Sequence, residues 1–93
     1  GSVFRNPEGN SAGRLLEEVG AKEFSCGGVN VWENHANFII NERAGTSGDV
    51  LELMYKMYSA VKTKFGIELK PEVRYLGNNS LREVELCKIL NIK

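Results

Sequence analysis

Apolar residues at helical spacing predict one long helix in the middle of the chain. They occupy Val50, Leu53, Met54, Met57, Val61 and Phe65, three or four residues apart, as on one face of a helix. Thr46 and Asp49 have the spacing of a capping box at the start, and Gly66 suits a helix C-terminus. We therefore expect a helix that begins near Thr46, ends before Gly66 and buries its methionines.

Two shorter helices are expected on either side of this one. Residues 11–19 show a helical pattern that Gly20 can end. Near the C-terminus, Ser80 and Glu83 offer a second capping box. The helix that follows would carry an apolar stripe, which consists of Leu81, Val84, Cys87, Ile89 and Leu90.

Short apolar or β-branched runs predict strands, which we place at residues 31–32, 38–40, 67–69 and 73–76. Residues rich in glycine, asparagine and proline separate these elements and are expected to form loops. The order is loop, helix, strands, long helix, strands, helix, without an internal repeat. The fold class expected is α+β, with a small sheet of short strands packed against two to three helices.

Composition limits the class of protein. A chain of 93 residues is expected to form one domain. Its 12 basic and 12 acidic residues give a formal net charge of zero, which argues against nucleic-acid binding. No apolar run approaches the ~20 residues that a membrane span needs. Two cysteines and one histidine make a disulfide framework or a zinc site unexpected, so we expect a cytoplasmic protein without a metal.

The residues alone do not name an activity. The candidate polar groups are Ser2, Arg5, Asn6, His35, Asn37, Glu72 and Arg74, and they form no local catalytic signature. Gly27 and Gly28 lack the spacing of a phosphate-binding loop. For His35 and Asn37 we favour hydrogen bonding that shapes a loop. Phe4 and Phe38 are expected in the core.

Three segments, in order, resemble one enzyme family. The start, GSVFRNP, resembles the GSxFxNP motif of the MurB family, the UDP-N-acetylenolpyruvoylglucosamine reductases. The segments AGRLLEEVGAKEFSCGGVNVWENHANFIIN and KFGIELKPEVRYLG are similar to later parts of that family. The resemblance implies a C-terminal substrate-binding domain over residues 1–77, with residues 78–93 as a helical extension of the same domain.

The resemblance also implies a reaction for the whole enzyme. NADPH would reduce FAD, and the flavin would reduce UDP-N-acetylglucosamine enolpyruvate to UDP-N-acetylmuramate for peptidoglycan synthesis. FAD would be bound by domains of the same protein that precede this chain. The isolated fragment is then expected to be inactive.

By position in the family motifs, Ser2 would be the catalytic proton donor, and Glu72 would stabilise or protonate the enol-type intermediate. Glu72 would have to be protonated or act with a cation. Asn6 would contact the UDP-sugar, Arg5 would add charge for its diphosphate, and Arg74 would face the same side of a strand as Glu72. This assignment requires Ser2 and Glu72 to meet across the folded chain and share a pocket.

Two other classes remain open. A free-standing module with the same fold would bind a nucleotide-sugar or a protein partner. A purely structural domain would use the exposed face of the C-terminal helix for interaction. Flavin-binding domains encoded upstream of Gly1 would favour the reductase.

Overall fold

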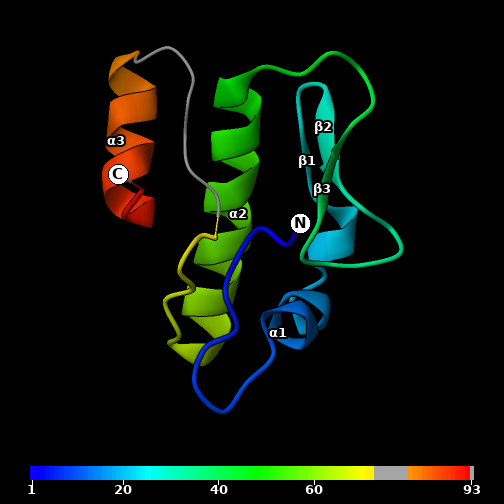
Figure 1. Ribbon diagram of the computed structural model, residues 1–93, viewed down its shortest axis with the longest axis vertical. Coiled ribbons are helices and arrows are strands. Elements are labelled where there is room, and N and C mark those ends of the chain that lie inside the picture. Colours follow the sequence, from blue (N-terminus) through cyan, green and yellow to red (C-terminus); the bar gives the residue numbers. More distant parts are fainter. Residues whose placement is uncertain (73–79, 93) are drawn as a thin grey trace.

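A long helix, α2 (Ser47–Phe65), forms the middle of the molecule. The computed structural model describes residues 1–72 and 80–92. Helix α3 (Leu81–Leu90) packs on one side of α2, and a small sheet and the short helix α1 (Ala12–Glu18) pack on the other (Figure 1). A 3₁₀ turn, η1 (Ala21–Glu23), joins α1 to the sheet. The α+β prediction is confirmed.

The predicted end of α2 at Gly66 is confirmed, and α1 begins at a cap that was not predicted. Of the capping box predicted at Ser80 and Glu83, only the bond from the Glu83 N–H to the Ser80 side chain is present. Ser11 accepts a hydrogen bond from the Arg14 N–H at the start of α1, and Gly66 ends α2 in the left-handed conformation with φ of 69°. A residue with a side chain pays a steric cost at such a φ, so glycine suits this position. None of the helices in residues 1–72 and 80–92 combines the length and the apolar character needed to cross a membrane.

The sheet is antiparallel and has the order β1 (Ser25–Cys26), β2 (Val29–Val31), β3 (Ile39–Asn41). Val29 pairs with Asn41 and Val31 with Ile39. The strand predicted at 31–32 thus begins earlier and does not include Trp32, and β1 was not predicted. With only two residues, β1 is too short to show an alternating pattern.

The double glycine serves the packing of this sheet. A side chain at Gly28 would collide with the Gly45 nitrogen and the Arg43 carbonyl oxygen. The Arg43 N–H donates to the Gly28 carbonyl at 3.1 Å. Two backbone segments therefore meet where only glycine leaves room, which agrees with the interpretation that Gly27 and Gly28 are not a phosphate loop.

The strand predicted at residues 67–69 is wrong. These residues form no strand, although Leu69 is buried. Just beyond them, among the residues that the structure describes, the chain pairs through an antiparallel bridge between Phe4 and Pro71. The hydrogen bonds of this bridge are made by Lys70 and Glu72, so the missing N–H of Pro71 does not prevent the pairing. The strand predicted at 73–76 lies outside the described residues.

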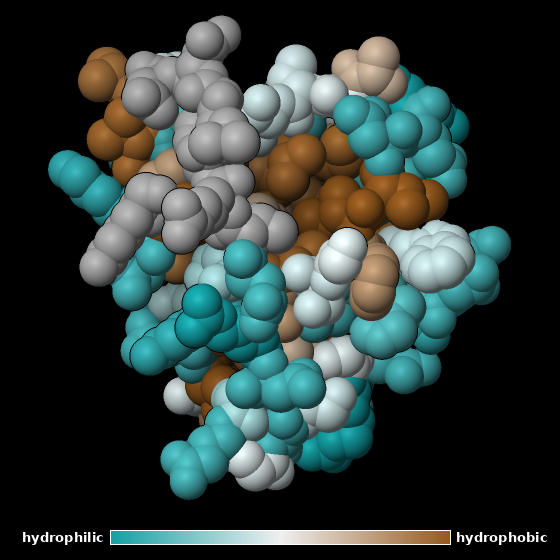
Figure 2. Space-filling model, viewed as in Figure 1, coloured by the Kyte–Doolittle hydropathy of each residue, from teal (hydrophilic) through white to brown (hydrophobic). Residues whose placement is uncertain are grey.

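One hydrophobic core joins all these elements. Met54 and Met57 are buried, as predicted, and so is Phe4, while Phe38 is half-buried. Trp32 is exposed and lies beside Phe38, with the ring centroids 5.9 Å apart. Apolar side chains also reach the surface between the upper half of α2 and the sheet (Figure 2).

The apolar stripe predicted for the C-terminal helix is wrong in part. Leu86 and Leu90 are buried against the core, while Leu81 is 93% exposed. Val84 and Ile89 are 39% and 40% exposed. Leu86 and Leu90 lie four residues apart and share one face, so α3 presents that face inward. The domain boundary at residue 77 stays a prediction, because it lies among residues that the structure does not describe.

The capping box of α2 makes the stability of the protein depend on pH. The Thr46 N–H donates to Asp49 Oδ2 at 3.0 Å, and the Asp49 N–H donates to Thr46 Oγ1 at 3.1 Å. The bond from the Thr46 backbone is the main cause that lowers the pKa of Asp49 below its ordinary value. A carboxylate whose pKa is lowered in the folded state stabilises the fold when the pH is above the pKa that the group has in the unfolded chain. This stabilisation is lost as the pH falls through the folded-state pKa.

We therefore expect Asp49→Asn to be less stable than the wild type at neutral pH. The difference should shrink as the pH falls through about 3.9, the value at which an unfolded aspartate is half protonated. Urea unfolding of both proteins at neutral and acidic pH measures this difference. A difference that stays constant with pH would contradict the assigned role of the carboxylate.

Candidate functional site

The first residues of the chain lie beside residues 70–72. The Arg5 N–H donates to the Lys70 carbonyl and the Glu72 N–H donates to the Val3 carbonyl, both at 2.8 Å. These bonds flank the bridge between Phe4 and Pro71. Figure 1 shows the two segments side by side along α2. The segments that carry the predicted serine and glutamate, 65 or more residues apart in sequence, therefore meet in the fold.

Asn37 holds the same segment from its other side. Its Oδ1 accepts from the Phe4 N–H at 3.0 Å, and its Nδ2 donates to the Phe4 carbonyl at 2.8 Å. The Asn37 carbonyl also accepts from the Val3 N–H at 2.8 Å. Residues 3–5 are thus held between residues 70–72 and Asn37.

His35 supports this loop, as predicted. Its Nδ1 accepts from the Asn37 N–H at 3.2 Å, and its ring stands edge-on to Phe38 with centroids 4.6 Å apart. The interpretation of His35 as a loop-shaping residue is confirmed. For Asn37 the structure adds a specific partner, the backbone of Phe4, which sequence reasoning did not identify. A polar residue between the apolar Ala36 and Phe38 was the available signal.

Two of the predicted site residues form an ion pair. Arg5 Nε and Glu72 Oε1 are 3.6 Å apart, with side chains 66% and 49% exposed. Such an exposed pair contributes little to stability. Both groups therefore remain open to a ligand, and Glu72 has a cation beside it.

Asn6 has a role in the fold that the sequence did not predict. Its Oδ1 accepts from the Ala12 N–H at 2.9 Å, next to the start of α1. Within the described residues, this bond leaves its amide nitrogen without a hydrogen-bond partner. Asn6 can therefore stabilise the loop and still offer a donor to a ligand. Arg74, the remaining predicted binding residue, lies outside the described residues.

Ser2 is half-buried and directly precedes the anchored residues. Its neighbour Val3 receives the N–H of Glu72 and donates its own N–H to Asn37. The backbone contact between the two segments satisfies one requirement of the predicted site. The shared pocket of Ser2 and Glu72 stays a prediction.

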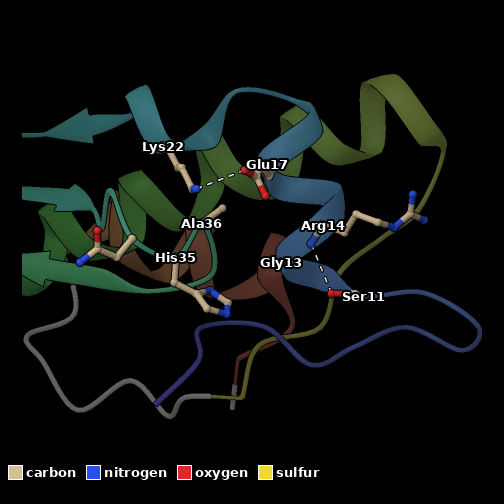
Figure 3. Close-up of a pocket in the computed structure, with 8 residues that line it drawn as sticks. Ser11, Gly13, Arg14, Glu17, Lys22, His35 and Ala36 are labelled. Carbon is tan, nitrogen blue, oxygen red and sulfur yellow. Dashed lines mark hydrogen bonds and ion pairs between the residues drawn. The ribbon is translucent and has the colours of Figure 1, made fainter.

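A separate hollow of about 230 Å³ lies between α1 and the loop at residues 34–36. Its basic residues are already paired: Lys22 contacts Glu17 at 3.2 Å, and Arg14 contacts Glu18 at 3.1 Å. In Figure 3 the guanidinium of Arg14 points away from the hollow. This hollow is therefore poorly suited to hold a phosphate group.

A model of one protein family matches residues 1–76. The family is described as UDP-N-acetylenolpyruvoylglucosamine reductase, C-terminal domain. The match shows that this chain is the kind of domain found at the C-terminal end of a larger reductase. More narrowly, the chain belongs to the MurB family, which confirms the resemblance of its three segments.

Curated relatives carry the same name. UDP-N-acetylenolpyruvoylglucosamine reductase from Moorella thermoacetica is 51% identical over 77 residues, which cover 83% of this chain and 26% of that protein. The reductase from Clostridium beijerinckii is 48% identical over 79 residues, covering 85% and 26%. The chain therefore spans about a quarter of the length of these relatives.

A solved structure supports the same relationship. The crystal structure of UDP-N-acetylenolpyruvylglucosamine reductase (MurB) from Thermus caldophilus has 39% sequence identity and a TM-score of 0.61 to this chain. The match covers 74% of this chain and 24% of that one. Sequence and fold thus agree on the family.

Proposed function

We propose that this chain is the substrate-binding part of a reductase that acts on the enolpyruvyl double bond of a UDP-sugar. The main support is the family match over residues 1–76. A second support is the contact between the segments of Ser2 and Glu72, which that chemistry requires. The substrate would be UDP-N-acetylglucosamine enolpyruvate and the product UDP-N-acetylmuramate, used in peptidoglycan synthesis in the cytoplasm.

The proposed chemistry needs a proton donor on this chain. Adding hydride to the enolpyruvyl double bond leaves negative charge on the carbon beside the carboxylate, and that carbon must then take up a proton. The Ser2 hydroxyl supplies it. A serine hydroxyl is a weak acid, so it acts only when it is held against a strongly basic carbon. Glu72, with Arg5 beside it at 3.6 Å, stabilises the enol form of the intermediate.

Binding of the nucleotide-sugar falls to residues next to the proton donor. The amide nitrogen of Asn6 donates to oxygens of the diphosphate or the sugar. The exposed guanidinium of Arg5 adds positive charge, which suits the planar recognition of phosphate oxygens. Arg74 completes this set in the proposal.

Flavin and nicotinamide would be held by the rest of the protein, and the flavin would supply the hydride. The double glycine of this chain does not fit a role in holding their phosphates. The backbone of Arg43 and Gly45 occupies the space beside Gly28, so a phosphate has no room there. Contact with the flavin-binding domains is therefore part of the proposal, and the isolated chain is expected to be inactive.

The test is an assay of the full-length protein that carries this domain. We expect NADPH oxidation that depends on UDP-N-acetylglucosamine enolpyruvate, and none from the 93-residue chain alone. Calorimetric titration of the chain with the nucleotide-sugar tests the alternative. Tight binding to the chain, together with no reductase activity in the full-length protein, would favour a free-standing binding module.

Asn6 offers a prediction that separates binding from folding. Asn6→Asp keeps an oxygen to accept the Ala12 N–H, which Asn6 now accepts at 2.9 Å, but it removes the amide donor. We expect substrate affinity in the full-length protein to fall by about 1–3 kcal/mol, with little change in thermal stability. Asn6→Ala should lose both affinity and stability, because it removes the acceptor too. Unchanged affinity in Asn6→Asp would exclude Asn6 from the binding site.

A further inference from the structure

The amide of Asn37 is committed to one backbone unit. The residue is only 3% exposed, and both polar atoms of its side chain bond to Phe4, at 3.0 and 2.8 Å. A side chain buried in this way is not available to a ligand. What it determines is the position of the Phe4 peptide groups, two residues after Ser2.

An amide side chain fits this arrangement. It presents an acceptor and a donor side by side, as a neighbouring strand would. An ionised aspartate offers acceptors only, so one oxygen would face the Phe4 carbonyl without a proton between them. A buried polar group left unpaired costs about 1–3 kcal/mol, and the Phe4 segment would move to avoid it.

We propose that Asn37 is the positioning residue for the Ser2 proton donor. This inference rests on the proposed function. Asn37 holds Phe4 through its side chain and Val3 through its carbonyl, on the side opposite to residues 70–72. The direction of the chain at Ser2 follows from these contacts. Because a misplacement of about 1 Å can cost about 10²-fold in rate, the clamp at Phe4 controls proton transfer without touching the substrate.

The test compares Asn37→Asp with a matched control, Asn41→Asp, in the full-length protein. Asn41 also uses both amide atoms on one backbone residue, Gly45, at 2.8 and 3.1 Å, but in an exposed turn. For Asn37→Asp we expect normal reduction of the flavin by NADPH, about 10–100-fold slower reoxidation of the flavin by substrate, and a loss of substrate affinity that is smaller than this loss of rate, because Arg5 and Asn6 follow Phe4 in the chain. The control should match the wild type in all three.

A double variant separates positioning from general loss of structure. In a Ser2→Ala background, Asn37→Asp should slow reoxidation little further, because the group it positions is already gone. Additive losses would overturn the inference. If Asn37→Asp reoxidised the flavin at the normal rate while Ser2→Ala did so slowly, the inference would be overturned and the proposed role of Ser2 would stand. A normal rate in Ser2→Ala would overturn the proposed role of Ser2 and the inference with it.

A second variant and a second measurement cover a failure to fold. Asn37→Gln keeps the amide but moves it by one methylene. We expect this variant to fold and to reoxidise the flavin more slowly than the wild type. Hydrogen exchange of the Val3 and Phe4 amides in the 93-residue chain should be faster in both Asn37 variants and unchanged in Asn41→Asp. Unfolding of both variants would make Asn37 a purely structural residue and would overturn the inference.

Discussion

Ser2→Ala in the full-length protein should leave the reduction of flavin by NADPH nearly unchanged and slow its reoxidation by the enolpyruvyl substrate by about 10²–10⁴-fold. The first half-reaction needs no proton from this domain. The second stalls when the carbon that has accepted hydride finds no donor, and general acid catalysis is worth about that factor. Stopped-flow absorbance of the flavin measures the two half-reactions separately.

The matched control for this prediction is Ser59→Ala. Ser59 is a half-buried serine on α2, outside the segment that we assign to proton donation, and its variant should behave as the wild type in both half-reactions. Equal slowing of both half-reactions in Ser2→Ala would refute the proposed role. A loss of substrate affinity without a change in the reoxidation rate would move Ser2 from catalysis to binding.

The helices were predictable from the sequence because several local signals agree for each one. For α2, the apolar spacing, the pair Thr46 and Asp49, and Gly66 all give nearly the same limits, and the structure has both capping-box bonds. The inward face of α3 was not predictable. Its apolar residues cover more than one side of a ten-residue helix, so only packing against α2 decides that Leu86 is buried and Leu81 is not.

The site was predictable only through family motifs. Nothing local in the sequence links residues 3–5 to residues 70–72, because one antiparallel bridge joins them and a bridge leaves no periodic pattern. The clamp at Asn37 is equally non-local, because Asn37 and its partner Phe4 are separated by 33 positions in the sequence. The motif at the start of the chain indicated which residues matter, and the structure adds how that segment is held.

Phe4→Ala should cause a large loss of stability. Phe4 is 1% exposed and belongs to the core, and replacing a buried phenylalanine with alanine costs about 3–5 kcal/mol through lost burial and a residual cavity. That is a large part of the 5–15 kcal/mol typical of whole domains. Urea unfolding of the 93-residue chain, followed by circular dichroism, measures the loss.

Leu81→Ala is the control, because it also removes a large apolar side chain, but one that is 93% exposed. Its free energy of unfolding should stay within about 0.5 kcal/mol of the wild type. If Phe4→Ala changed stability as little as Leu81→Ala does, the N-terminal segment would not be packed into the core. Residues 3–5 would then not be held firmly enough to aim a proton donor, so this stability measurement tests the structural basis of the catalytic proposal without a substrate.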